Sequence, residues 1–403
     1  NASLMDGSCV SGLRFESLLP LVQEDVDKVR SKENPQVVIV VAHTSMGKGD
    51  GQSLERQGLD LFNSLKGVDV LVTGHDHSTK VLKTDSTVLL DCGRAGQYAC
   101  LADIKLVVRG GKVISRSLSG EVESFGSENY DTAMEEAFKS DYEKVRDFNA
   151  SHVGEVKKDL VSREFYYRQC DYMNFLHALA FSAWPVDISL SATLLIDGMV
   201  PAGEVRYQDI RKIYPYDNKL VVLRLTGAEI LRYLEASYDA WISTVPGPAE
   251  GSHVLRITQT KDYATGGMKW KLAKSPANFD SAAGIRYTVD VTKPYGSRVT
   301  VSGMADGSPF EMDKDYSVAI TSYRSTGSGG LMKAAGLMDA RSVEDRIIYR
   351  GPEFRTILYR YLKKHGSIDP AVVGDPNVVG SWRFVPDFAP EAIKADVELI
   401  YGK

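Results

Sequence analysis

Two short runs of β-branched and aliphatic residues, 37–42 and 70–73, each lead into histidine within one residue. A strand that ends in a turn holds its last side chain at a rigid sheet edge, where catalytic ligands are commonly carried. His43 follows the first run. His75 and His77 follow the second and can share one face of an extended chain. Because imidazole nitrogens suit zinc, iron or manganese, the pattern favours a metal site over the alternative of polar loop histidines.

The composition is that of an ordinary globular protein. The 403 residues are 43% hydrophobic and 25% charged, which leaves room for two or more hydrophobic cores. The formal net charge is −5 and the sequence has no Lys/Arg-rich block, so no positive electrostatic potential attracts a polyanion. We therefore expect no nucleic acid polymer as partner. A small phosphorylated ligand stays open. We expect no membrane span, because the apolar runs are too short to cross a bilayer.

The cysteines Cys9, Cys92, Cys100 and Cys170 show no Cys-x-x-Cys spacing, so neither a zinc knuckle nor a thioredoxin-like motif is indicated. Cys92 and Cys100 flank an expected strand pair and can form a bridge. We favour the alternative of buried free thiols.

Hydrophobic periodicity predicts three parts: residues 1–126, a connector at 127–153 and a second domain at 154–403. In the first part we expect strands at 68–73, 81–90, 100–108 and 112–118, a helix from about Leu54, and a hairpin turn at Gly110-Gly111. Ser127 can cap a connector helix that runs to about Asn149. In the second domain we expect a helical segment at 163–182 with a satisfied His177, a strand at 187–190, a capping box from Thr226 to Glu229, and a last helix with Pro352 in its first turn.

A second group of candidate residues lies on two turns of the second domain. Tyr216 and Asn218 lie in a Pro-, Asp- and Asn-containing turn before a strand, and Tyr323 ends another strand ahead of a glycine-rich loop at 327–330. Two tyrosines can clamp a planar ring, and an Asn amide can both donate to and accept from its edge. With 20 tyrosines in the chain, the pattern alone equally allows loop tyrosines without a ligand.

The motifs resemble two known families. Ala42–Gly47 and Gly74–His77 look like the last two motifs of calcineurin-like metallophosphoesterases. The region from about Gly154 to Pro386 looks like the C-terminal domain of the 5′-nucleotidase family, most of all its 2′,3′-cyclic-nucleotide 2′-phosphodiesterase/3′-nucleotidases. The resemblance rests there on Tyr214-Pro215-Tyr216-Asp217-Asn218, Asn278-Phe279-Asp280, Tyr323-Arg324 and Ser381-Trp382-Arg383. The implied fold class is α/β, a partial metallophosphoesterase α/β/β/α sandwich followed by an α+β 5′-nucleotidase C-terminal domain.

The resemblance implies a hydrolase that cleaves nucleotide phosphoesters with two divalent ions, such as manganese, zinc or iron. His43 and His75 would share one ion, and His77 would bind its neighbour. Tyr216 and Tyr323 would sandwich the base of a nucleotide or nucleoside, with Asn218 at the base edge. The family often has an Asp in the glycine loop, where this chain has Gly329.

Three earlier family motifs, Asp-x-His, Gly-Asp-x-x-Asp and Gly-Asn-His-Glu/Asp, have no match before Val37. We therefore expect a chain truncated at its N-terminus that binds a single metal weakly at best, has no catalytic residue of its own, and is inactive as it stands. The alternative is a noncatalytic nucleotide-binding or partner-binding module. An incomplete sandwich would expose strand edges and favour self-association. The resemblance also implies export to the periplasm.

Overall fold

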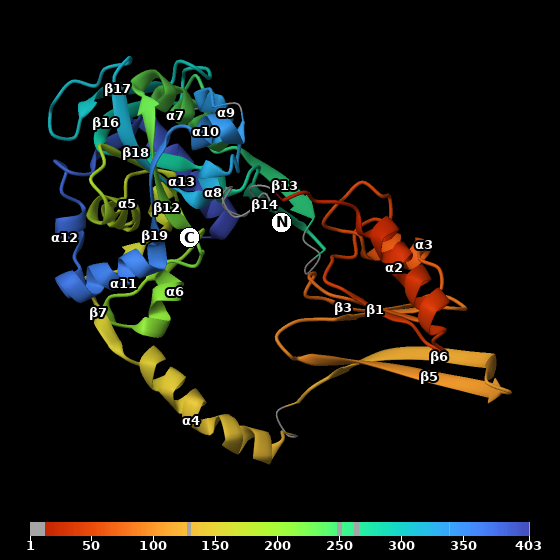
Figure 1. Ribbon diagram of the computed structural model, residues 1–403. Helices are drawn as coiled ribbons and strands as arrows, with labels where there is room; N and C mark the ends of the chain where they lie inside the picture. The colour runs from red at the N-terminus through yellow and green to blue at the C-terminus, as the bar shows by residue number, and fades with distance from the viewer. Residues whose placement is uncertain (1–12, 127–129, 248–251, 262–265, 338, 403) are drawn as a thin grey trace. The chain divides into compact units, whose positions relative to one another are not determined.

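Helix α4 (Thr132–Asn149) carries the division of the chain into two units, which falls between Ser140 and Asp141. The computed structural model describes residues 13–126, 130–247, 252–261, 266–337 and 339–402 (Figure 1). The helix ends at Asn149 as the sequence predicts, whereas its predicted cap, Ser127, lies outside the described residues. The domain boundaries at 126 and 153 stay a prediction.

The first unit is built on a sheet that has the strand order β1-β2-β4-β3 within the described residues. Its elements are α2 (Leu18–Glu33), β1 (Ile39–Ala42), α3 (Gly58–Ser64), β2 (Val70–Thr73), β3 (Thr79–Lys83), β4 (Val88–Cys92), β5 (Tyr98–Arg109) and β6 (Lys112–Ser124). Strands β1, β2 and β4 are parallel, and β3 is antiparallel to β4. Strands β5 and β6 form a long hairpin around the predicted glycine turn (Figure 1).

The alternation of side chains across β2 and β4 covers both faces of this sheet. Leu71 and Leu89 pack in one cluster with Leu61 of α3, while Val70 and Val88 pack in another with partly buried hairpin residues. Because neighbouring side chains of a strand point to opposite faces, continuous apolar strands require such two-sided cover. The sheet edges that carry the histidines therefore rest on a packed core.

Strand β1 lies at the edge of the sheet, and its outer face is apolar. Ile39 and Val41 are exposed, Val41 to 77%. An exposed apolar edge strand is a template for pairing with another strand. Self-association through this edge stays a prediction.

Two sequence predictions for the first unit are wrong, and one helix was missed. The run at 81–90 is not one strand, because it turns between β3 and β4, where the Thr84 N–H donates to the Thr87 carbonyl oxygen at 2.9 Å. Asp85 and Ser86 supply the turn residues that break the run. The helix expected from Leu54 begins at Gly58, and helix α2 was not predicted at all.

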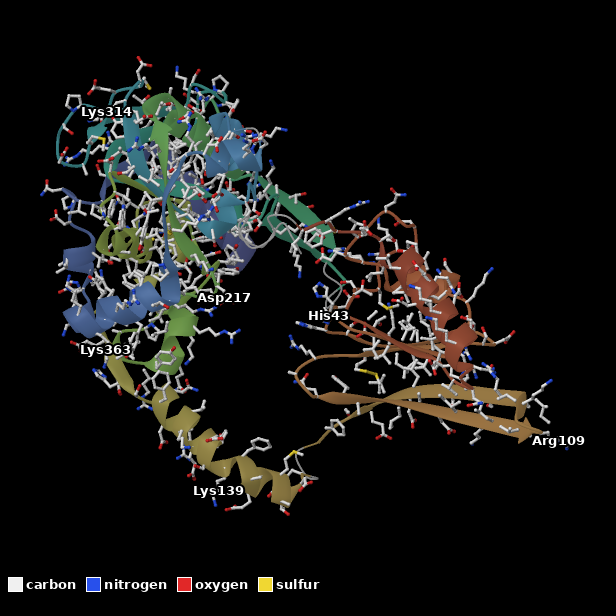
Figure 2. The ribbon with its side chains drawn as sticks, viewed as in Figure 1. His43, Arg109, Lys139, Asp217, Lys314 and Lys363 are labelled. Atoms are coloured by element: carbon white, nitrogen blue, oxygen red, sulfur yellow. A yellow bond between two sulfur atoms is a disulfide. The ribbon has the colours of Figure 1, made fainter. Side chains whose placement is uncertain are left out.

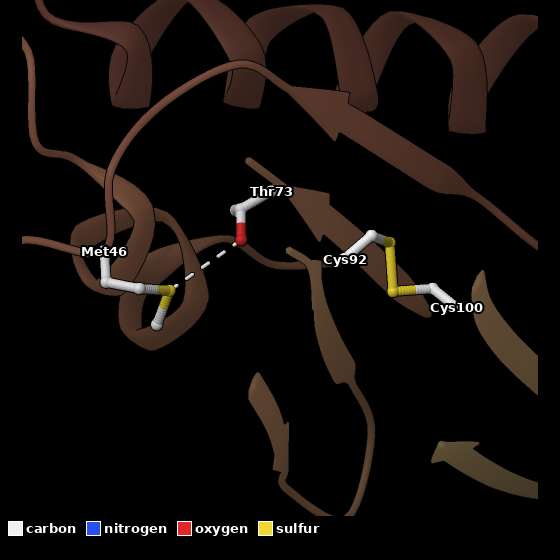
Figure 3. Close-up of a disulfide and its surroundings, with 4 residues drawn as sticks. All are labelled: Met46, Thr73, Cys92 and Cys100. Carbon is white, nitrogen blue, oxygen red and sulfur yellow. Dashed lines mark hydrogen bonds between the residues drawn. A yellow bond between two sulfur atoms is a disulfide. The ribbon is translucent and has the colours of Figure 1, made fainter. Parts of the chain in front are cut away.

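Cys92 and Cys100 form a disulfide, so the expectation of free thiols is wrong (Figure 3). Cys92 ends β4, and the short connection after it turns back into β5, which places the two Cα atoms 5.5 Å apart. That separation lies within the range a disulfide requires. Among the described residues Cys170 is a free, buried cysteine.

The second unit is built on a sheet that has the order β15-β9-β18-β12-β19 within the described residues. Its strands are β7 (His152–Val156), β8 (Leu160–Val161), β9 (Ile188–Ala192), β10 (Met199–Val200), β11 (Gly203–Arg206), β12 (Lys219–Thr226), β13 (Ile257–Lys261), β14 (Met268–Leu272), β15 (Asp280–Ala283), β16 (Ile285–Asp290), β17 (Val299–Met304), β18 (Asp315–Thr321), β19 (Ile347–Glu353), β20 (Ser367–Ile368) and β21 (Gly380–Val385). The smaller sheets are β11-β7-β20, β17-β16-β21, β10-β8 and β13-β14.

Helices cover the sheets of the second unit (Figure 1). They are η2 (Arg163–Tyr166), α5 (Asp171–Ala183), η3 (Tyr207–Asp209), α6 (Ile210–Ile213), α7 (Gly227–Trp241), η4 (Pro276–Asn278), α8 (Ser322–Ser325), α9 (Leu331–Ala335), α10 (Ala340–Glu344), α11 (Phe354–His365), α12 (Pro370–Val373) and α13 (Phe388–Tyr401). No helix of the described residues is long and apolar enough to cross a lipid bilayer.

In the second unit the capping box and the satisfied His177 are confirmed, while the helical segment expected at 163–182 is divided into η2 and α5 and the helix expected around Pro352 is absent there. The capping box forms, since Thr226 Oγ1 accepts from the Glu229 N–H at 3.2 Å and Glu229 Oε2 accepts from the Thr226 N–H at 2.8 Å. His177 is buried between the hydroxyls of Ser189 and Ser281, as expected of a satisfied core histidine. Pro352 does not lie in a helix. It lies in β19, an edge strand, where a missing N–H is tolerated.

Candidate functional site

The end of the five-stranded sheet gathers the polar residues of the second unit. Because β12 is antiparallel to β18, the start of β12 lies beside the end of β18, with Leu220 paired to Thr321. Strand β19 ends beside the same point, with Glu353 paired to Lys219. Strand β9, parallel to β18, also ends here, beside the start of β15. The segments that precede or follow these strands therefore meet at one edge.

A cavity of about 480 Å³ lies at this edge. It is lined by Leu190, Ser191, Ala192, Leu194, Tyr216, Asp217, Asn218, Ala277, Asp280, Thr321, Tyr323 and Arg324. The structure thus brings the three candidate ligand-binding residues, Tyr216, Asn218 and Tyr323, to one pocket of mixed aromatic, aliphatic and polar character. Tyr216 is 48% exposed, so its ring is open to contact from solvent. The roles of the three residues stay a prediction.

Helix α11 holds the turn that carries Tyr216. Arg355 donates from Nε to the Tyr214 carbonyl oxygen at 3.0 Å and from Nη2 to the Pro215 carbonyl oxygen at 2.5 Å, and it pairs with Asp217 (labelled in Figure 2). The Phe354 N–H donates to the Asn218 carbonyl oxygen at 2.9 Å. These bonds fix the backbone on both sides of Tyr216.

Tyr214, two residues before Tyr216, anchors the same turn in the core. Its buried ring stacks on Phe354 with centroids 5.1 Å apart. Burial raises the pKa of the Tyr214 hydroxyl, and a side-chain hydrogen bond with Asn218 opposes that rise. The Asn218 side chain therefore lies beside the Tyr214 hydroxyl.

The opposite side of the pocket contains a buried ion pair that sequence reasoning missed. Arg324 and Asp280 are both nearly inaccessible, and Arg324 donates to Asp280 from Nε at 2.9 Å and from Nη2 at 2.5 Å. The Tyr233 hydroxyl donates to the same carboxylate at 2.5 Å. Burial lowers the pKa of Arg324, but the nearby Asp280 carboxylate outweighs it, and the net pKa is raised. Asp280 and Arg324 belong to the motifs Asn278-Phe279-Asp280 and Tyr323-Arg324, and this membership was the sequence signal that could have pointed to the pair.

In the first unit, the structure brings two of the three candidate histidines together. His75 Nδ1 lies 3.3 Å from His43 Nε2 (His43 is labelled in Figure 2), and His75 Nε2 lies 3.3 Å from Glu55 Oε1. Two nitrogens bound to one tetrahedral zinc ion at about 2.0–2.1 Å would lie about 3.4 Å apart. The pair therefore fits a shared metal ion, and it equally fits an N–H···N hydrogen bond. Within the described residues no group of three or more His, Cys, Asp or Glu side chains forms a metal-binding arrangement.

The loop that carries His75 and His77 has unusual backbone geometry. His75 has φ of 100° and His77 of 55°, in the left-handed region that non-glycine residues seldom occupy. Between them, the Asp76 carboxylate accepts from the Met46 N–H at 2.7 Å, and this bond lowers the pKa of Asp76. Such conformations persist where the surroundings hold them, and they cluster at functional sites. Metal binding by His43, His75 and His77 stays a prediction.

Comparison with protein families identifies the second unit. The family model of the 5′-nucleotidase C-terminal domain matches residues 152–336. Over these residues the chain is similar to that family. The 5′-nucleotidase C-terminal domain includes Tyr216, Asn218 and Tyr323 and therefore the main wall of the pocket.

Curated relatives extend the likeness beyond the 5′-nucleotidase C-terminal domain. The chain is 22% identical to the trifunctional nucleotide phosphoesterase protein YfkN of Bacillus subtilis over 89% of its own length and 26% of that protein. It is 22% identical to the 2′,3′-cyclic-nucleotide 2′-phosphodiesterase/3′-nucleotidase of Salmonella typhimurium, over 94% of this chain and 63% of that one. The relative of the same description from Haemophilus influenzae is 28% identical over 46% of this chain and 26% of its own.

The chain thus spans between about a quarter and two thirds of the length of these relatives. A crystal structure of a Staphylococcus aureus protein assigned to the 5′-nucleotidases superposes with a TM-score of 0.58 at 17% identity, and covers 92% of this chain and 68% of that one. The predicted mixed α/β fold with a 5′-nucleotidase C-terminal domain is confirmed.

Proposed function

We propose that the cavity at the sheet edge binds the nucleoside part of a nucleotide. The observation that carries this proposal is the meeting of Tyr216, Asn218 and Tyr323 at one pocket, from the turn before β12 and from α8 more than 100 residues later in sequence. Aromatic faces stack on any nucleobase, and an amide offers both a donor and an acceptor to its edge. Of the charged side chains that line the pocket, Arg324 and Asp280 pair with each other and Asp217 pairs with Arg355 of α11, which suits an uncharged ring.

Calorimetry with adenosine tests this proposal. We expect saturable binding, weakened about 5- to 100-fold in Tyr216→Ala, because stacking contributes about 1–3 kcal/mol per base. Tyr295→Ala is the matched control, since Tyr295 is an exposed tyrosine of the same unit outside the pocket. No heat at millimolar adenosine, or equal losses in the two variants, contradicts the proposal.

The activity we infer from the relatives is metal-dependent hydrolysis of nucleotide phosphoesters, of the 2′,3′-cyclic-nucleotide 2′-phosphodiesterase/3′-nucleotidase or 5′-nucleotidase kind. The names of the relatives and the His43–His75 pair support it. A divalent ion bound there would supply Lewis-acid chemistry to a phosphoryl group. His43, His75 and His77 would hold it. Two close dications also need negative charge between them, which neutral imidazoles do not provide, so we propose negligible turnover for this chain alone.

Steady-state assays on 2′,3′-cyclic AMP and bis-p-nitrophenyl phosphate with Mn²⁺ test that inference. We expect rates at background for this chain, and substantial metal-dependent turnover contradicts the expectation. A second candidate function, noncatalytic nucleotide binding, is favoured by one observation: every residue that lines the pocket belongs to the second unit, so binding does not require the histidines. Saturable adenosine binding that is unchanged in His75→Ala supports this second function.

We also propose that the protein is exported. The Cys92–Cys100 disulfide supports this location, because disulfides persist in oxidising compartments such as the bacterial periplasm and are rare in the cytosol. Thiol counting on protein purified under alkylation from its native cells tests the proposal. Alkylation of both Cys92 and Cys100, which would show that both are free thiols, contradicts the proposal.

A further inference from the structure

Arg324 is a buried arginine whose hydrogen-bonding capacity is fully used inside the protein. Nε and Nη2 donate to Asp280, and Nη2 also donates to the Ala277 carbonyl oxygen. Nη1 donates to Asn278 Oδ1 and to the Ser328 carbonyl oxygen, each at 3.1 Å. These bonds use all five N–H donors of a guanidinium group. Arg324 lines the pocket, yet it has no donor left for a ligand.

The same guanidinium group contacts the aromatic ring of the neighbouring residue, Tyr323. Its central carbon lies 5.3 Å from the centroid of the Tyr323 ring, within the range of a cation–π contact. The Tyr323 ring therefore contacts the Arg324 guanidinium group, and Asp280 holds that group in place. Because Asp280 also accepts from the Tyr233 hydroxyl of α7, this chain of contacts reaches the helical layer of the domain.

The glycine-rich loop closes over Arg324 on the far side. A Cβ atom at Gly329 would lie 2.4 Å from Arg324 Nη1 and 2.4 Å from Asn278 Oδ1, and the residue has φ of +79°. Both facts require glycine at this position. The Arg324–Asn278 pair occupies the space that a side chain at 329 would need, which explains why this chain carries no Asp there.

We propose that Arg324 is a positioning residue that holds Tyr323 at the angle for stacking on a nucleobase. This inference rests on the proposed function of the pocket. The guanidinium group acts through Tyr323 and the loop at 327–330 rather than by contact with the ligand. The buried Arg324–Asp280 pair then keeps the Tyr323 ring rigid. The ring is already ordered before a nucleoside binds, so binding does not carry the entropy cost of ordering it.

A double-mutant cycle tests the proposal. Arg324→Lys keeps the charge but loses the planar fork that joins Asp280, Asn278 and the loop. We expect about tenfold weaker adenosine binding by calorimetry in this variant, within the range of one base stack. In a Tyr323→Ala background the same substitution should weaken adenosine binding less than about twofold, because the aromatic ring through which Arg324 acts has been removed. Equal losses in both backgrounds, or no loss in the single variant, overturn the proposal.

The control and a milder variant separate positioning from general loss of stability. Arg232→Lys alters another arginine of this unit, which donates to the Ala335 carbonyl oxygen outside the pocket, and should leave adenosine affinity unchanged. Asn278→Ala removes one of the two Nη1 acceptors but leaves the ion pair with Asp280, and should weaken adenosine binding by less than Arg324→Lys. Unchanged affinity in Asn278→Ala together with a loss in Arg232→Lys overturns the proposal.

A second measurement does not depend on any ligand. Amide hydrogen exchange should accelerate at residues 322–330 in Arg324→Lys, with little change in β12 or β18. Unchanged exchange in this segment overturns positioning by Arg324. If the unmodified protein shows no adenosine binding, the proposed function of the pocket fails, and the exchange result alone decides whether Arg324 holds the Tyr323 ring.

Discussion

Arg355 Nε donates to the Tyr214 carbonyl oxygen at 3.0 Å and so joins two segments that lie 141 residues apart in sequence. Together with its bonds to Pro215 and Asp217, it ties the first turn of α11 to the turn that carries Tyr216. We predict that Arg355→Lys weakens adenosine binding about 3- to 10-fold, because lysine cannot satisfy these acceptors with a planar fork. Calorimetry measures the loss.

The control for this prediction is Arg341→Lys. Arg341 is 90% exposed and forms a long ion pair of 4.0 Å with Asp345, so its replacement should leave adenosine affinity unchanged. Equal affinity of Arg355→Lys and the unmodified protein would show that the turn keeps its shape without the fork.

The buried His177 makes stability depend on pH. Burial lowers its pKa from 6.5 to about 4, against a smaller opposing effect of Asp280. Between these values the unfolded chain binds a proton that the folded chain does not, so the free energy of unfolding falls as the pH drops from 6.5 to 4. A full shift of this size corresponds to about 3 kcal/mol. Urea unfolding of the second unit at several pH values measures the slope.

Two variants check the assignment to His177. His177→Gln should flatten the dependence between pH 6.5 and 4, because the titrating group is gone. His152→Gln is the control on an exposed site, because the His152 side chain is 64% exposed, and it should leave the dependence unchanged. A slope that survives in His177→Gln assigns the dependence to another group.

The disulfide should stabilise the first unit. A bridge that spans eight residues removes loop-closure entropy from the unfolded chain, worth about 2–3 kcal/mol. We predict that the double variant Cys92→Ser/Cys100→Ser lowers the local stability of β4 to β6 by that amount, measured by amide exchange. Dithiothreitol should cause the same loss in the unmodified protein and none in the double variant. An unchanged double variant contradicts the prediction.

The histidine pair should bind one divalent ion weakly. Two imidazoles at 3.3 Å can share an ion, and Glu55 lies beside them, but these side chains give fewer ligands than a closed zinc site. We predict that calorimetry with Zn²⁺ near pH 7.5 shows a single weak site, lost in His43→Ala and in His75→Ala. His365→Ala, an exposed histidine of the second unit, is the control. Retained binding in His43→Ala places the ion elsewhere.

Sequence patterns predicted what depends on neighbours along the chain. The capping box at Thr226 and the glycine hairpin at Gly110 are local signals that the structure confirms, as is the strand before Tyr323, although Tyr323 itself lies in the short helix α8 and not on a turn. The meeting of Tyr216, Asn218 and Tyr323 at one pocket was expected only through the family resemblance, because it depends on the pairing of β12 with β18.

What remained unpredicted depends on partners far apart in sequence. The ion pair of Arg324 with Asp280 joins residues 44 positions apart, and nothing local marks either as buried. The Cys92–Cys100 bridge requires the hairpin to turn back over the sheet, which spacing alone does not reveal. The strand assignment of Pro352 required knowledge that β19 is an edge strand.

The pairing of Leu220 with Thr321 has one more consequence. Tyr216 precedes β12 and Tyr323 follows β18, so the hydrogen-bonded pairing of these two strands holds the segments that carry both tyrosines at one end of the sheet. Loosening this one strand pair would therefore displace both tyrosine-bearing segments together.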